Sequence, residues 1–167
     1  AGTYTPTVTF TDASGNESTV ALTSFVIDDT APTLIEDTVV STPSNDTTPS
    51  VVISSNEAGT ITSSLGFTST TTGISGDNTI TFNTLNAGTY TPTVTFTDAS
   101  GNESIVTLTS FVIDTAAPTV SSFTLSDSAL NSGDTSTVTI VFSEAVTGFA
   151  SDDDVTASNG SLSTMTS

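Results

Sequence analysis

The feature that most constrains the fold of this chain is an internal repeat. Residues 1–33 read AGTYTPTVTFTDASGNESTVALTSFVIDDTAPT and residues 87–119 read AGTYTPTVTFTDASGNESIVTLTSFVIDTAAPT, an offset of 86 residues with four differences. A unit of this length suits one β-sandwich domain and is too long for the repeating unit of a solenoid. The differences are Thr19 to Ile105, Ala21 to Thr107, Asp29 to Thr115 and Thr30 to Ala116. The first two suit strands and the last two fall where one unit joins the next, so the junctions vary while the strands stay fixed.

The repeat also predicts where the domains begin and end. The first copy starts within the unit, so residues 1–29 are expected to be the last two strands, F and G, of one domain. Residues 30–115 would form a complete domain. Residues 116–167 do not match residues 34–68 and would open a repeat of a second type, incomplete after about four strands. Because the sequence begins within a repeat, without Met or a signal peptide, we expect an interior stretch of a longer protein.

Alternation of apolar and polar residues indicates strands throughout the chain. Between Tyr90 and Phe96, every second residue is apolar and the residues between them are threonines. Apolar residues from Val106 to Ile113 mark the following strand, with an irregularity expected at Ser110. The same pattern predicts earlier strands at Leu34–Val40, Ser50–Ser54, Thr60–Leu65 and Asn78–Phe82. The predicted fold class is all-β, with tandem immunoglobulin-like β-sandwich domains, one complete and two partial.

Tyr90 stands at the start of a predicted strand in the sequence LNAGTY, and Tyr4 is its copy. This arrangement resembles the tyrosine corner of immunoglobulin-like sandwiches, in which the hydroxyl of a tyrosine near the start of strand F bonds back to the backbone. The simpler interpretation is a core tyrosine at the start of a strand.

Two longer patterns carry a resemblance to a known family. They are TPSNDTTPSVVISSNEAGTI, followed by NTLNAGTYTPTVTFTDASGNES and FVIDDTAPT, and SEAVTGF at residues 143–149. They resemble the bacterial immunoglobulin-like tandem repeats of giant secreted surface adhesins of the RTX, type I secretion kind. The resemblance implies an extracellular or cell-surface location, and domain junctions that calcium makes rigid.

Composition excludes several classes of function. The chain has 18 acidic residues and no Lys, Arg, His or Cys. Without cationic side chains, nucleic-acid binding and attraction to an anionic membrane are not expected. Without His and Cys there is no Ser-His-Asp triad, no thiol nucleophile and no zinc site of the usual kind. A two-carboxylate glycosidase stays formally open, but we expect no enzyme. No apolar run is long enough to predict a transmembrane helix.

The unpaired carboxylates point instead to a hard cation bound through oxygen, and calcium is the expected cofactor. In a sandwich of this topology, the segment entering a domain meets its BC and FG loops at one end. For the complete domain, these segments carry the candidate ligands Asp28, Asp29, Glu57, Asp98 and Asn102. The alternative for Asp98 and Asn102 is simple turn chemistry, in which Asp begins the turn and Gly-Asn supplies positive φ. The two interpretations are compatible.

A second junction carries fewer candidate ligands. Asp114 lies in its linker and Glu144 in its BC-like loop, while Thr115 replaces Asp29. We expect a weaker or empty site there. Asp12 and Asn16 repeat the FG pair without a linker inside the sequence. The run of acids at residues 152–154 is interpreted as a solvated loop, with a calcium site as the alternative.

The leading hypothesis for function is mechanical: an extender, or stalk, of an extracellular adhesin or surface fibre. Its partners would be neighbouring immunoglobulin-like domains of the same chain or filament. Pro32 and Pro118 would limit the freedom of the linkers. One alternative is a filament subunit assembled by strand pairing between chains. The other is a carbohydrate- or ice-binding module, although the outward threonine ladders are short and are explained by β propensity.

Overall fold

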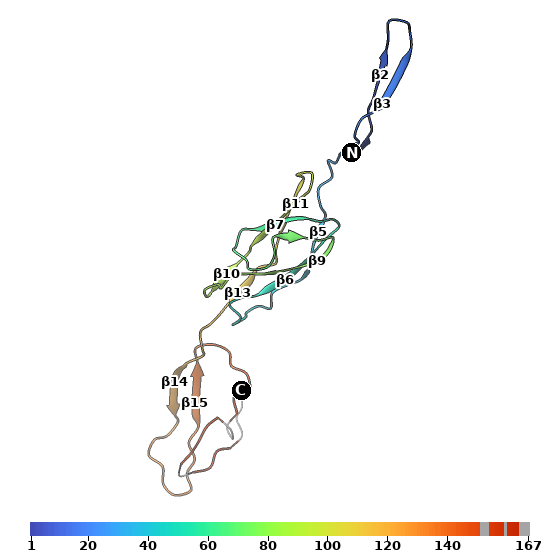
Figure 1. Cartoon of the computed structure of the whole chain (residues 1–167). Coiled ribbons are helices and arrows are strands. Elements are labelled where there is room, and N and C mark those ends of the chain that lie inside the picture. Colours follow the sequence, from blue (N-terminus) through green and yellow to red (C-terminus); the bar gives the residue numbers. More distant parts are fainter. Residues whose placement is uncertain (151–153, 159, 164–167) are drawn as a thin grey trace. The chain divides into compact units, whose positions relative to one another are not determined.

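A computed structural model describes residues 1–150, 154–158 and 160–163. Its regular structure consists of β-strands, and no helix is found among the described residues, so none there is long and apolar enough to cross a membrane. The prediction of an all-β fold is therefore confirmed. The chain divides into two compact units, Ala1–Thr115 and Ala116–Ser167 (Figure 1).

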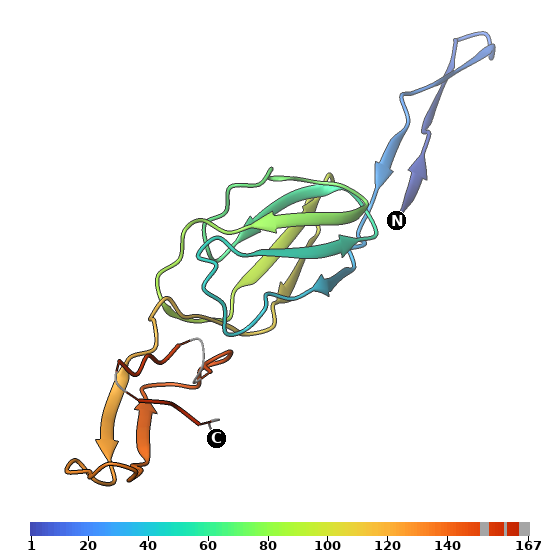
Figure 2. The ribbon, with the colours of Figure 1, turned by 90° about the horizontal axis from the view of Figure 1, so that it is seen from below.

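The centre of the first unit is a sandwich of two antiparallel sheets (Figure 2). One sheet has the order β5-β6-β9 and the other the order β12-β11-β7-β8. The first sheet consists of β5 (Leu34–Thr38), β6 (Ser50–Ser55) and β9 (Gly76–Thr81). The second consists of β7 (Gly59–Ser63), β8 (Thr72–Gly73), β11 (Thr93–Asp98) and β12 (Glu103–Thr107). The predicted strands are present with ends shifted by up to two residues, and β8 is additional.

Period-two alternation builds the core between these sheets. In β11, Val94 and Phe96 are fully buried while the threonines between them are partly exposed. Val51 and Ile53 of β6 face them from the other sheet. Each fully buried side chain of this size contributes about 1.5–3 kcal/mol of transfer free energy. The core consists of Val40, Val51, Ile53, Ile61, Ile80, Phe82, Leu85, Val94, Phe96, Leu108, Phe111 and Ile113.

The F and G strands are interrupted rather than continuous. The strand expected from Tyr90 to Phe96 is divided into β10 (Gly88–Tyr90) and β11, so the prediction of one unbroken strand was wrong. Pro92 lies in the gap, where it has no N–H for a ladder and its carbonyl accepts a bond from the Leu108 N–H at 2.9 Å. The irregularity expected at Ser110 is present, because β12 ends at Thr107 and β13 (Phe111–Ile113) pairs with β10.

Tyr90 makes the hydrogen bond that a tyrosine corner requires. Its hydroxyl donates to the carbonyl of Asn86 at 3.0 Å, and its ring stacks on Phe111 with centroids 5.7 Å apart. Tyr4 stacks on Phe25 in the same way, at 5.6 Å. The counterpart of the Asn86 carbonyl would precede Ala1 in the numbering, so only the stacking half of the corner is described for Tyr4.

Residues 2–27 form a hairpin with the same registers as the F and G strands of the sandwich. β1 (Gly2–Tyr4) pairs with β4 (Phe25–Ile27), and β2 (Thr7–Thr11) pairs with β3 (Glu17–Ala21). Gly2 faces Ile27 as Gly88 faces Ile113. All residues of these four strands are exposed, whereas the copies of Val8, Phe10, Phe25 and Ile27 belong to the core of the sandwich. The same sequence therefore forms the same hairpin with and without a covering sheet.

The second unit contains β14 (Val120–Leu125) and β15 (Val138–Phe142), paired antiparallel. About four strands were expected, and the described residues hold these two. Thr119 and Ser143 exchange two hydrogen bonds, at 2.8 and 2.9 Å. Thr33 and Asn56 do the same at the start of the complete domain. The beginning of the second unit thus repeats a local contact of the first, although the two sequences differ there.

Candidate metal centre

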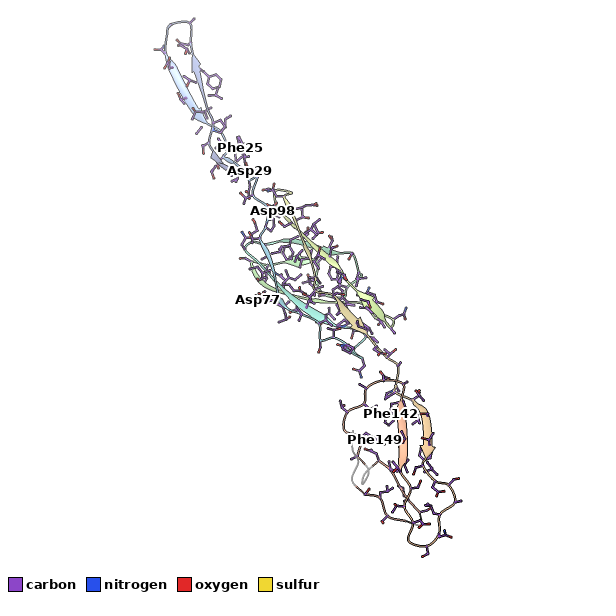
Figure 3. All side chains as sticks on the ribbon, turned by 180° about the vertical axis from the view of Figure 1, so that it is seen from behind. Phe25, Asp29, Asp77, Asp98, Phe142 and Phe149 are labelled. Carbon is purple, nitrogen blue, oxygen red and sulfur yellow. The ribbon has the colours of Figure 1, made fainter. Side chains whose placement is uncertain are left out.

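Three segments distant in sequence meet at one end of the complete sandwich. They are the segment that precedes β5, the β6–β7 loop and the β11–β12 turn, and each contributes one acid. One carboxylate oxygen from each of Asp28, Glu57 and Asp98 lies within 4.8 Å of the others. Asp98 is labelled at this end of the sandwich in Figure 3. This group joins three of the five ligands that the sequence predicted for this junction.

Asp98 is buried, and its own turn satisfies its carboxylate. Oδ1 accepts the backbone N–H groups of Ser100 and Asn102, both at 2.8 Å, and Oδ2 accepts the side-chain amide of Asn102 at 2.8 Å. The Asn102 amide is the main cause that lowers the pKa of Asp98 below its usual range. Burial opposes this shift, while the backbone donors of the turn add to it. Asp98 is therefore held as a carboxylate at neutral pH.

Gly59 brings the β6–β7 loop against this turn. It pairs directly with Asp98 in the β7–β11 ladder, and a Cβ at this position would lie 2.4 Å from the Thr97 carbonyl oxygen. Glycine alone permits that approach. Glu57, two residues earlier, is fixed by Ser55, whose hydroxyl donates to the Glu57 carbonyl at 2.7 Å. The close pairing at Gly59 places the half-buried Glu57 next to Asp98.

The segment that carries Asp28 is tied to the sandwich by backbone contacts. The Asn102 amide donates to the Asp28 carbonyl at 3.1 Å, and the Ser104 hydroxyl donates to the carbonyl of the buried Pro32. The Thr33 N–H donates to the Asn56 side chain at 2.6 Å. Ser104 and Asn56 were not among the predicted site residues. Their positions in the FG and BC segments were the signal that could have revealed them.

The turn at Asp12 has the same sequence as the Asp98 turn but lies away from the junction, so it shows which contacts the turn makes by itself. Asp12 accepts bonds from the Ser14 N–H, the Asn16 N–H and the Asn16 amide, each at 2.8 Å. The Asn16 amide is again the main cause that lowers the pKa of Asp12. Asp12 belongs to no three-carboxylate group in the described part of the chain. The turn therefore forms without neighbouring acids, and Asp28 and Glu57 are what distinguish the junction.

The other predicted ligands of this junction are placed differently. Asp29 is exposed and belongs to no three-carboxylate group among the described residues. The two side chains differ in their local bonds, since Asp28 Oδ1 accepts the Thr30 N–H at 3.1 Å in a turn of its own. Asn102 contacts two residues of the group, but it directs its amide N–H groups, rather than its oxygen, at the Asp98 carboxylate and the Asp28 carbonyl.

The candidates at the second junction belong to different units of the chain. Asp114 follows β13 in the first unit, while Glu144 follows β15 in the second, and neither belongs to a three-carboxylate group in the described ranges. Pro118 is exposed. Residues 152 and 153 of the acidic run lie outside the described residues. Asp154 accepts the Ala150 N–H at 2.8 Å within its own loop.

The chemistry of the Asp28 group suits a hard divalent cation. All its donors are oxygens, and the sequence has no Lys, Arg or His to neutralise them. Calcium binds six to eight oxygens at roughly 2.3–2.6 Å, so two oxygens on one ion lie at most about 5 Å apart. The 4.8 Å limit within the group meets this condition. The residues present therefore fit calcium, with Asp28, Glu57 and Asp98 as carboxylate ligands.

Comparison with known families gives two matches. Residues 35–115 match one family with the description Bacterial Ig-like domain, and residues 114–167 match a second family with the same description. No curated protein and no solved structure matches the chain. The two matches follow one another with an overlap of two residues, and they cover both the complete sandwich and the second unit.

Proposed function

We propose that this chain, which is built of bacterial immunoglobulin-like domains, is a stalk segment of an extracellular surface protein whose first junction is stiffened by calcium. The observation that carries the proposal is the meeting of Asp28, Glu57 and Asp98 where the chain enters the complete domain. Asp28 belongs to the linker and the other two to the domain. An ion shared by them would connect linker and domain directly.

Electrostatics gives the ion a mechanical role. Three carboxylates within 4.8 Å repel one another, and no side-chain cation in the sequence offsets this repulsion. Without an ion, the least constrained partner is Asp28, because among the described residues its segment is tied to the sandwich by the Asn102 amide and by the contacts at residues 32–33. Calcium would turn the repulsion into attraction and restrict the linker. The stalk would then be stiff with calcium and more flexible without it.

A non-catalytic role agrees with the surface of the complete domain. A hollow of about 560 Å³ on this unit is lined by Thr48, Thr68, Thr81, Phe82, Asn83 and Thr84. None of these side chains is an acid, a base or an activated nucleophile. The acids of the junction are instead held by a turn and a linker, as a structural site requires.

Small-angle scattering and thermal unfolding test this proposal on the 167-residue chain. We expect calcium to raise the melting temperature and sharpen the distribution of maximum dimensions, and a chelator to reverse both effects. Asp98→Asn should abolish the calcium response. Asp12→Asn is the matched control, because it makes the same change in the same turn away from the carboxylate group, and it should keep the response. A melting temperature and maximum dimension that ignore calcium would contradict the proposal.

A second candidate function is a subunit of an extracellular filament assembled by strand pairing between chains. The observation that favours it is the apolar face of the residue 2–27 hairpin, where Phe10 is 60% exposed. Light scattering at increasing protein concentration tests this candidate. A filament subunit forms species that grow with concentration, whereas a stalk segment stays monomeric.

A further inference from the structure

The hairpin of residues 2–27 presents an apolar face whose exact copy is buried elsewhere in the same chain. Phe10 is 60% exposed, whereas its copy Phe96 is 0% exposed. The same contrast holds for Phe25 and Phe111. The exposed face consists of Tyr4, Val8, Phe10, Val20, Leu22, Phe25 and Ile27. The hairpin of residues 2–27 therefore lacks the covering sheet that buries the hairpin of residues 88–113.

The two faces are chemically identical. All seven residues of the exposed face are unchanged at the offset of 86 residues. The strand differences, Thr19 to Ile105 and Ala21 to Thr107, fall outside the face, and Ile105 is itself 65% exposed. Whatever fits the buried face therefore fits the exposed one.

The exposed face is large enough to support stable docking. Three aromatic and four aliphatic side chains, each about half exposed, present on the order of 500 Å² of apolar surface. Burial against a matching face would remove about 1,000 Å² in total, the area that a biological interface should reach. Charge does not oppose docking, because the only acids of the hairpin are Asp12 and Glu17, at its tip.

The buried copy shows what kind of segment covers such a face. The F and G strands of the complete domain pack against side chains from β6, β7 and β9 and from the residue that follows β9. Phe82, for example, stacks on Phe111 with ring centroids 6.1 Å apart. The covering side chains are Val51, Ile53, Ile61, Ile80 and Phe82. All come from residues 34–86, which supply every strand of the sandwich except F and G.

The same chain cannot use its own residues 34–86 to cover the hairpin. Pro32 is bound to Ser104 at one end of the sandwich, and Ile27 would have to reach the position of Ile113 at the other. Ser104 and Ile113 are nine residues apart along the strands, about 30 Å at the usual rise. Five residues from Ile27 to Pro32 span at most about 18 Å. The linker is too short.

Exchange of hairpins with an intact second copy of the chain offers no net burial either. Each copy of the chain has two such hairpins, residues 2–27 and 88–113, but among the described residues a single segment, residues 34–86, covers such a face. If one copy inserted its first hairpin into another copy, the second hairpin of that other copy would be displaced and exposed in turn. Exchange between copies therefore leaves the same apolar area in water and costs association entropy.

We propose that the apolar face of the residue 2–27 hairpin is a docking surface for an immunoglobulin-like strand segment equivalent to residues 34–86 that has no F and G strands of its own. Docking would reproduce the interface of the complete domain and complete a further sandwich. This inference rests on the domain architecture and not on calcium. The docking proposal can therefore be wrong while the calcium proposal holds, and the reverse is also true.

The test joins a copy of residues 30–86 to the amino end of the full chain, so that residues 30–86 and 1–29 make one whole repeat. Hydrogen exchange is then measured at Thr7–Thr11 and Glu17–Ala21. We expect these amides to exchange at least about a hundredfold more slowly than in the 167-residue chain, as a folded core requires. The protection of these amides should approach that of Thr93–Asp98 and Glu103–Thr107. Slow exchange in those two reference strands also verifies that the complete domain is folded.

Two variants make the result specific. A matched extension that carries Ile53→Ser and Phe82→Ser should give no protection of the hairpin. Phe10→Ser should remove the protection in the extended chain but leave the melting temperature of the 167-residue chain unchanged. Rapid exchange of the hairpin in the extended chain would overturn the proposal. So would concentration-dependent protection in the 167-residue chain, because it would show that two copies pack face to face.

Discussion

The side-chain amide of Asn102 donates to the backbone carbonyl of Asp28 at 3.1 Å, across 74 residues of sequence. The same amide donates to Oδ2 of Asp98 at 2.8 Å. One side chain therefore connects the linker of the complete domain to the acid at its FG turn. This double contact explains why a turn residue has a role in the junction, and it gives the first prediction.

Asn102→Ala should lower the unfolding free energy of the chain more than Asn16→Ala does. Asn102→Ala removes bonds to both Asp98 and Asp28, whereas Asn16→Ala removes only the bond to Asp12. Hydrogen bonds to charged groups contribute about 1.5–3 kcal/mol when they are well formed. Urea unfolding of the two variants checks the difference, and equal midpoints would mean that the linker contact contributes nothing.

Stability should fall in acid because of Asp98. The pKa of Asp98 is lowered in the folded chain, so the folded state holds the carboxylate more strongly than the unfolded state does, where the pKa is about 3.9. The resulting stabilisation is fully present above the unfolded pKa and is lost as the pH falls through the lower, folded pKa. Unfolding free energy measured in chelator from pH 6 downward should show this loss, and Asp98→Asn should reduce its slope.

Gly59→Ala should be strongly destabilising. The new Cβ would lie 2.4 Å from the Thr97 carbonyl oxygen, and both atoms belong to paired strands that cannot separate freely. Overpacking of this kind costs about 1–3 kcal/mol. Gly160 is the control, because a Cβ there meets no atom within 4 Å. Equal melting temperatures for the Gly59→Ala and Gly160→Ala chains would contradict the close approach of β7 to β11 at Gly59.

The two tyrosines should respond differently to loss of their hydroxyl groups. Tyr90→Phe removes the bond to the Asn86 carbonyl and should cost about 0.5–1.5 kcal/mol. Tyr4→Phe keeps the stacking on Phe25 and should leave the stability of the 167-residue chain unchanged. Thermal unfolding of both variants measures the difference. Equal losses would show that the corner bond is not what stabilises the strand start.

Much of the fold was predictable because the pattern of the core is local. Alternation predicted β5, β6, β7 and β9 within two residues, and the repeat predicted that the hairpin of residues 2–27 copies the F and G strands. The break at Pro92 was missed, although proline cannot donate to a ladder, because its apolar ring keeps the alternation intact. β8 was missed because two residues, Thr72–Gly73, carry no period.

The candidate site was predictable in part for a topological reason. The order of strands in the sandwich brings the linker, the BC loop and the FG turn together, and one carboxylate oxygen from each of Asp28, Glu57 and Asp98 lies within 4.8 Å of the others. Topology does not determine the direction of a single side chain, so the separation of Asp29 was not foreseen. The contacts of Ser104 and Asn56 to the linker depend on the packing of the folded domain, which the sequence pattern does not show.

Calcium titration by calorimetry tests the central claim most directly, with Glu57→Gln as the decisive variant. This change removes one carboxylate of the group but leaves the Asp98 turn and the Asn102 contacts in place. Glu17→Gln, in the hairpin, is the control. We predict that the 167-residue chain binds calcium, that Glu17→Gln binds equally well, and that Glu57→Gln weakens binding about tenfold or more. Equal affinity for calcium in Glu57→Gln and the unaltered chain would contradict the proposed site.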